Sequence, residues 1–115
     1  MRNKEQIEMA IIENAGIIDR LRTQMQNQPG LDQNGLVDYV EMHNQILSKF
    51  LNLYKNDKMP SLEVESAVKA DLQNVELMLE SDKQSLEKEG YTNIKYFLRT
   101  PSLNVARRQL KWLLT

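Results

Sequence analysis

The chain has 115 residues, with 15 Lys and Arg against 16 Asp and Glu, one His and no Cys. A chain of this length predicts a single domain that buries enough surface to fold without disulfide bonds or a structural metal. The absence of cysteine excludes thiolate nucleophiles, cysteine-ligated zinc and iron–sulfur clusters. With 41% hydrophobic and 27% charged residues, the composition is that of an ordinary globular protein.

Charged or polar side chains recur every few positions in the opening residues, so the sequence predicts no secretory signal peptide. No stretch approaches the ~20 consecutive apolar residues that span a bilayer, and a membrane partner is not expected. We therefore expect a cytoplasmic protein, which is the default for a chain without targeting signals.

Two amphipathic helices are predicted in the first half of the chain. Apolar residues recur at alternating spacings of four and three over about residues 3–27 and again over about residues 36–56. This rhythm places them along one face of a helix. Between the two helices, Pro29 and Gly30 predict a loop over residues 27–35, because proline cannot continue a helix and glycine supplies turn conformations.

A third amphipathic helix is predicted over about residues 62–89, after a break that Pro60 introduces. The hydroxyl of Ser61 is suited to cap its first turn, where backbone N–H groups lack partners. Asp82 interrupts the apolar stripe of this helix, so we expect the helix to bend or fray after Ser81.

The last quarter of the chain has a less regular pattern. Residues 93–99 are compatible with a short extra helix or with an extended segment. Thr100 and Pro101 then predict a new helix start, with a capping hydroxyl followed by proline in the first turn. Val105 and Trp112 lie seven residues apart and away from the main apolar stripe, so this final helix is apolar on more than one side.

These elements predict an all-α fold made of two antiparallel helical hairpins, residues 3–56 and residues 61–115. Short connections place neighbouring helices antiparallel, and the hairpins are expected to pack as a four-helix bundle-like domain over residues 1–115. Asn14 and Asp82 interrupt apolar stripes. Such residues either fix the register or the oligomeric state of packed helices, or lie at the solvated ends of the packed region.

The sequence predicts no enzyme, no cofactor site and no small-molecule substrate. The four glycines are too scattered to build a phosphate-binding loop. The single histidine, His43, lies on an apolar stripe between Val40 and Leu47. Asp38 and Glu41 do not share its helical face, so a packed histidine at a helix seam is favoured over a general base.

A metal site is not expected either. Glu76 and Glu80 share a helical face, and paired carboxylates can bind a cation. Glu80 and Glu87, however, both lie at helical pairing distance from Lys83. A solvated, charge-laced face is therefore the favoured interpretation.

Charge is distributed unevenly, because residues 90–115 carry +5 and residues 1–89 carry −6. Four of the seven aromatic side chains also lie in this last quarter. Basic residues interleaved with aromatic ones suit nucleic-acid binding, since cations neutralise phosphates and rings stack on bases. The basic segment can equally pack against the acidic third helix, or dock on an acidic protein partner with Val105 and Trp112 as anchors.

We expect a small non-catalytic interaction protein (an adaptor, an inhibitor or an assembly factor) that binds a protein partner or a second copy of itself through this region. Nucleic-acid binding is the alternative, because Arg107, Arg108 and Lys111 fall within about one helical turn, where they can follow a phosphate backbone together. The candidate partner-binding residues are Lys95, Arg99, Val105, Arg107, Arg108, Lys111 and Trp112.

Two motifs, LEKEGY at 86–91 and TPSLNVARRQL at 100–110, resemble the helical hairpin of some phage small terminase subunits. In those proteins a helix that ends in Glu-Gly is followed by a variable loop and an amphipathic helix opened by proline. The resemblance covers about a quarter of the chain, and no DNA-binding helix-turn-helix precedes it. It implies a phage-type DNA-packaging accessory protein, which is one form of the nucleic-acid alternative.

Overall fold

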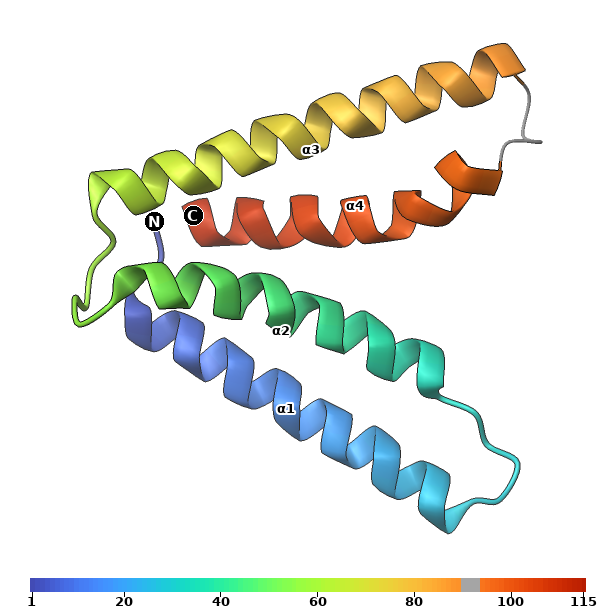
Figure 1. Ribbon diagram of the computed structural model, residues 1–115. Coiled ribbons are helices and arrows are strands. Elements are labelled where there is room, and N and C mark those ends of the chain that lie inside the picture. Colours follow the sequence, from blue (N-terminus) through green and yellow to red (C-terminus); the bar gives the residue numbers. More distant parts are fainter. Residues whose placement is uncertain (90–93) are drawn as a thin grey trace.

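The computed structural model describes residues 1–89 and 94–115, without the side chains of residues 94–97. The predicted all-α fold is confirmed, because the described residues form helices and no strand (Figure 1). The helices are, in chain order, α1 (Lys4–Asn27), α2 (Asn34–Tyr54), α3 (Leu62–Glu89) and α4 (Ile94–Leu114).

Local side-chain contacts explain where the first two helices begin. At the start of α1, the Asn3 side chain accepts from the backbone N–H of Gln6, and the Gln6 side chain accepts from that of Asn3. This reciprocal pair is a capping box. α2 begins two residues earlier than the sequence predicted, because the Asp32 carboxylate accepts a hydrogen bond (3.0 Å) from the backbone N–H of Asn34.

α2 ends at Tyr54, where the backbone reverses direction. Lys55 has φ 53° and ψ −120°, and the backbone N–H of Asp57 donates to the Tyr54 carbonyl oxygen (2.9 Å). These angles are those of the first central position of a type II′ turn, which favours glycine. The helix therefore stops about two residues before the predicted end.

The last two helices are more continuous than the sequence indicated, and α4 is also longer. α3 stays helical past Ser81 to Glu89, so the expected fraying is corrected. Asp82 is held against α4 by Arg99, so the polar residue does not interrupt packing. α4 runs through Pro101 without a new start. Proline removes one backbone hydrogen bond from a helix interior, and Figure 1 shows the first turns of α4 at an angle to the rest.

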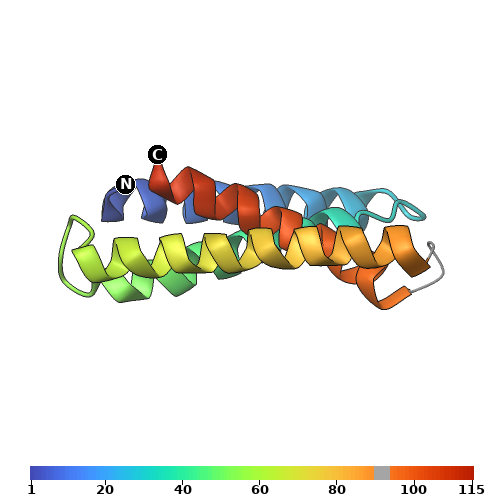
Figure 2. The same ribbon diagram turned by 90° about the horizontal axis from the view of Figure 1, so that it is seen from above.

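The helices form two antiparallel hairpins, α1 with α2 and α3 with α4, as predicted. α2 packs against α4 and less extensively against α3, so α1 and α3 lie at the outer edges (Figure 1). The hairpins diverge like the arms of a V, and the molecule is flat, with extents of 47 × 43 × 18 Å (Figure 2). Its radius of gyration, 16.8 Å, exceeds the about 13 Å typical of a compact chain of this length.

A shared core lies at the closed end of the V, where the two hairpins meet. Burial of its apolar surface is the main contribution to stability. The hydroxyl of Tyr54 in this core donates to the Arg2 carbonyl oxygen (2.7 Å), and burial raises the pKa of that hydroxyl. The buried core residues come from all four helices and are Ile7, Leu47, Phe50, Tyr54, Val64, Val68, Leu110 and Leu113.

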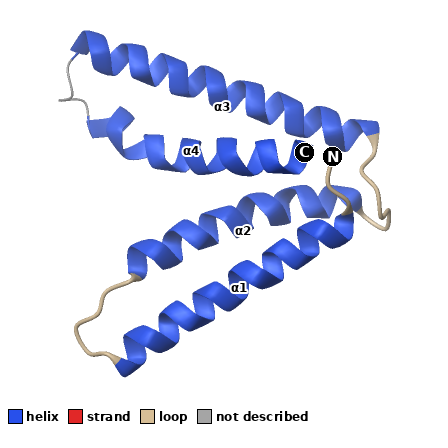
Figure 3. Cartoon of the chain, turned by 180° about the vertical axis from the view of Figure 1, so that it is seen from behind, coloured by secondary structure: helices blue, strands red, loops and turns tan. Residues whose placement is uncertain are grey.

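The first residues of the chain close this end of the molecule. The backbone N–H of Arg2 donates to the Leu113 carbonyl oxygen (2.9 Å). The guanidinium of Arg2 donates to the Trp112 carbonyl oxygen (3.2 Å). The guanidinium also lies 4.5 Å from the centroid of the Trp112 ring. Because the last carbonyls of a helix lack partners within it, Arg2 caps α4, and the chain ends lie side by side (Figure 3).

A polar contact crosses each hairpin. The Asn14 side-chain amide donates to the Asn44 side-chain oxygen (2.8 Å), and Asn44 in turn donates to the Ile11 carbonyl oxygen (3.2 Å). In the second hairpin Arg99 pairs with the carboxylate of Asp82, which is 1% exposed. Both residues that interrupt the apolar stripes are thus paired across a hairpin, which favours one register of its helices.

Candidate functional site

α4 carries the residues that the sequence proposes for partner binding, and it lies between α3 and α2 (Figure 1). Val105 is 2% exposed, and the half-buried Trp112 packs against the core. The expectation that Val105 anchors a partner is therefore corrected, because its side chain packs within this chain. The position of α4 between two helices also explains why it is apolar on more than one side.

The basic residues of α4 largely face the acidic helix α3. Arg99 pairs with Asp82, and Lys111 Nζ lies 3.7 Å from Oε1 of Glu76. Packing of the basic segment against the third helix, which the sequence left as one alternative, is therefore present in the structure. The side chain of Lys95 lies outside the described residues.

Arg107 and Arg108 lie on different sides of α4. Arg108 donates to the hydroxyl of Tyr39 on α2 and, with Trp112, lines a hollow of about 280 Å³ next to α1 and α2. Arg107 instead lies on the side of α3, where its guanidinium forms no hydrogen bond or ion pair within the described part of the chain. The structure therefore separates Arg108 from Arg107 and Lys111, which the sequence had grouped along one phosphate backbone.

An open groove of about 590 Å³ runs between the distal parts of α3 and α4. The half-buried Leu79 and Leu86 provide its apolar surface, and charged side chains surround them. Three carboxylates and two cations line the groove, so its net charge is negative. The groove is lined by Glu76, Leu79, Glu80, Lys83, Leu86, Glu87, Thr100, Asn104 and Arg107.

His43 is placed as a packed histidine at the seam of α2. It is 8% exposed, and its Nδ1 donates to the Tyr39 carbonyl oxygen (2.8 Å). Its ring packs edge-on against the ring of Tyr39, with 4.7 Å between the centroids. His43 lines neither the groove between α3 and α4 nor the hollow beside Arg108.

Within residues 1–89 and 94–115, no group of three or more His, Asp or Glu side chains is placed to hold a metal ion. None of the helices in the same residues combines the length and the apolarity that crossing a bilayer requires.

No family model, curated protein or solved structure matches this chain.

The part of the groove that α3 contributes was not recognised from the sequence as a site. Glu80, Lys83 and Glu87 follow the helical spacing of a charged face, and that spacing alone predicts contact with water. The same face becomes one wall of a groove only because Thr100 and Asn104 of α4 lie opposite it. A helical pattern defines which residues share a face, but it does not define what lies across from that face.

Proposed function

We propose that this protein is a small non-catalytic interaction protein that binds a segment of a protein partner along the groove between α3 and α4. This proposal rests on Arg107, an exposed guanidinium next to the half-buried Leu79 and Leu86. Arginine beside apolar side chains is enriched at protein interfaces, because it combines apolar contact with directed hydrogen bonds.

The charges of the groove define the chemistry of the segment that would bind. Glu80 and Glu87 stand on the α3 side, and Arg107 stands on the α4 side. These positions suit an amphipathic segment whose apolar side chains cover Leu79 and Leu86. Its basic groups would face the carboxylates of α3, and an acidic group would face Arg107, so that opposite charges meet.

Nucleic-acid binding, including the DNA-packaging role that the terminase resemblance implies, has less support. Arg99 and Lys111, two cations that would contact phosphates, already face carboxylates of α3. The groove next to Arg107 contains more carboxylates than cations. A phosphate backbone would have to compete with these carboxylates, and its own charge would be repelled by the others.

Affinity capture from a lysate of the producing cells, with and without nuclease, tests the proposed function. The wild-type chain should retain a protein partner in both lysates. Arg107→Glu should weaken this capture about tenfold or more, because it places a carboxylate opposite the acidic group of the partner. Lys69→Glu is the matched control, since Lys69 is exposed on α3 outside the groove and pairs only weakly with Glu65 (3.5 Å).

Capture that the Arg107 variant leaves unchanged would contradict the assignment of the groove. Capture that disappears on nuclease treatment would favour the nucleic-acid alternative instead.

A further inference from the structure

The outer face of α1 has features that the fold of its own chain does not use. The buried residues of α1, Ile7 and Ile18, lie on the side that packs against the rest of the molecule. The opposite side forms a free edge of the flat molecule (Figure 1). On this side Met9 is 55% exposed and Ile12, three residues later on the same face, is 68% exposed.

Gly16 follows one turn after Ile12 on the same outer face. A Cβ at this position would meet no atom within 4 Å, and no left-handed backbone angle requires glycine there. Glycine in the interior of a helix costs about 1 kcal/mol relative to alanine. Nothing in the described part of the chain offsets this cost, and the space beside Gly16 is open to a group that approaches from outside.

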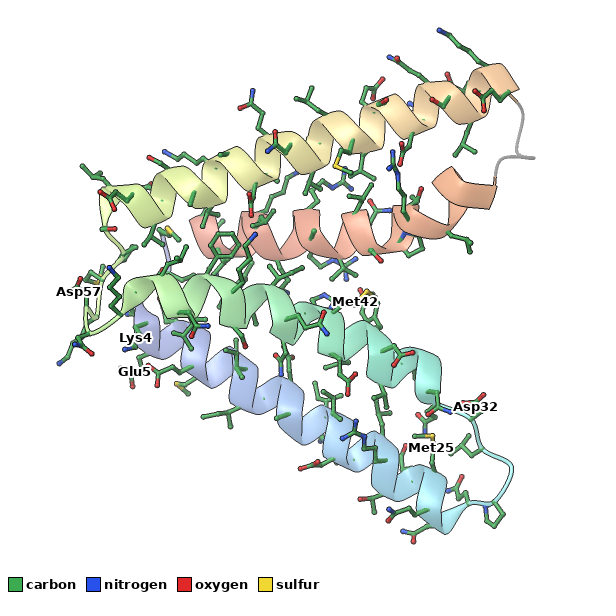
Figure 4. The ribbon with its side chains drawn as sticks, in the orientation of Figure 1. Lys4, Glu5, Met25, Asp32, Met42 and Asp57 are labelled. Atoms are coloured by element: carbon green, nitrogen blue, oxygen red, sulfur yellow. The ribbon has the colours of Figure 1, made fainter. Side chains whose placement is uncertain are left out.

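Charges of opposite sign flank these residues at equal spacing. Glu5 lies four residues before Met9, and Arg20 lies four residues after Gly16. Both are exposed, and neither takes part in an ion pair within residues 1–89 and 94–115. Figure 4 shows Glu5 on the side of α1 that is turned away from α2.

We propose that two copies of this chain associate through these faces as an antiparallel pair of α1 helices. A two-fold axis that passes midway between Ile12 and Glu13 brings Met9 of one copy opposite Gly16 of the other. The same axis brings Glu5 of one copy opposite Arg20 of the other, about 11 Å from the axis along the helix. Every contact occurs twice, as two-fold symmetry requires.

The partner is a second copy of this chain, because the face is complementary to itself after a two-fold rotation. The Met9 side chain fills the space that Gly16 leaves, which lets the two backbones approach closely. Burial of Met9 and Ile12 supplies most of the affinity, since exposed ion pairs contribute little by themselves. The pairs of Glu5 with Arg20 favour the antiparallel orientation and this register, because a parallel pair of helices brings Glu5 opposite Glu5, and a shifted register separates Glu5 from Arg20.

Sedimentation equilibrium of the purified full-length protein over a series of concentrations tests this dimer. The wild-type chain should dimerise, and Arg20→Glu should weaken the dimer about tenfold or more, because it places two carboxylates opposite each other at both ends. The double variant Glu5→Arg/Arg20→Glu restores both ion pairs, with the acidic and the basic position exchanged. Its dissociation constant should return to within about threefold of the wild-type value.

Gly16→Leu should abolish the dimer while the circular dichroism of the helices remains, because the face is exposed in the monomer. Two controls should leave the dimer intact. Leu62→Ser removes an apolar side chain that is 82% exposed elsewhere, and Arg107→Glu makes the same charge change on α4. A chain that stays monomeric at every concentration, or a dimer that the charge exchange does not restore, would overturn the proposal.

Discussion

Asp82 and Arg99 join α3 to α4 through a carboxylate that is almost fully buried. Taking a charge out of water is costly unless an opposite charge and hydrogen bonds compensate for it. The guanidinium of Arg99 provides this compensation, while its own outer part still reaches solvent. The pair therefore constrains how the two helices align more than it adds to the free energy of unfolding.

Removing one partner of this pair should be more harmful than removing both. Arg99→Ala is expected to lower the free energy of unfolding by about 3 kcal/mol, because it removes the cation that faces a buried carboxylate. The double variant Asp82→Leu/Arg99→Leu should lose clearly less, because the charge that needs compensation is gone as well. Urea unfolding followed by circular dichroism measures both changes. A double variant that is less stable than the single one would contradict this account.

Single residues also show where prediction from the sequence stops. Asn14 and Asp82 are recognisable as exceptions to apolar stripes, but their partners Asn44 and Arg99 are not. A stripe defines which residues share a helical face, whereas a partner depends on how far two helices slide along each other. Val105 illustrates the same point, because its burial depends on α4 having a helix on either side.

At the scale of the elements, the turn after α2 contains a lysine, Lys55, at a position whose backbone angles favour glycine. Lys55 adopts a positive φ that costs a non-glycine residue about 1 to 3 kcal/mol. Its carbonyl oxygen accepts a hydrogen bond from Nζ of Lys4, which links the turn to the start of α1. The turn therefore stores strain at the point where the first hairpin leads into the second.

Lys55→Gly should relieve this strain and raise the free energy of unfolding by about 1 kcal/mol, after the greater freedom of glycine in the unfolded chain is included. Asn52→Gly is the matched control, since Asn52 is exposed inside α2. The control should lower the free energy of unfolding by up to about 1 kcal/mol, because glycine is a poor helix former. Thermal and urea unfolding distinguish the two, and equal losses in both variants would argue against strain at Lys55.

The first three helices were predictable because each one carries a long apolar stripe, and the structure places them over nearly the residues that this spacing indicated. Their ends were less predictable. Asp32 starts α2 early and Lys55 stops it early, and both effects come from single hydrogen bonds or backbone angles that periodicity does not contain. Pro101 was expected to open a helix, yet α4 tolerates it as a bend within a longer one.

At the scale of the whole molecule, the near-neutral net charge is the sum of an acidic part and a basic part of the chain, which pack against each other. Residues 1–89 carry −6 and residues 90–115 carry +5. α4 places much of the positive charge against α3, where Glu76 and Asp82 receive two of its cations. The pairing leaves little field to attract distant anions, so recognition at the groove depends on contacts at short range.

The V shape predicts that stability is unequal along each hairpin. Around Phe50 and Leu110, at the closed end, all four helices contribute buried side chains. Amides there should exchange with solvent only through global unfolding. Amides around Thr23 and Gln84, in the distal parts of the arms, should exchange through local opening that depends little on urea. Hydrogen exchange at several urea concentrations measures this, and uniform protection along α1 and α3 would contradict it.

The chain is nearly a closed ring. Because the backbone of Arg2 bonds to that of Leu113, the four helices follow one another around a circuit whose last step is a hydrogen bond instead of a peptide. A short linker across this gap, with a cut in the loop after Asn27, would give a circular permutant that keeps every helix and the whole core. The fold thus constrains the cyclic order of its helices and leaves open which of them comes first.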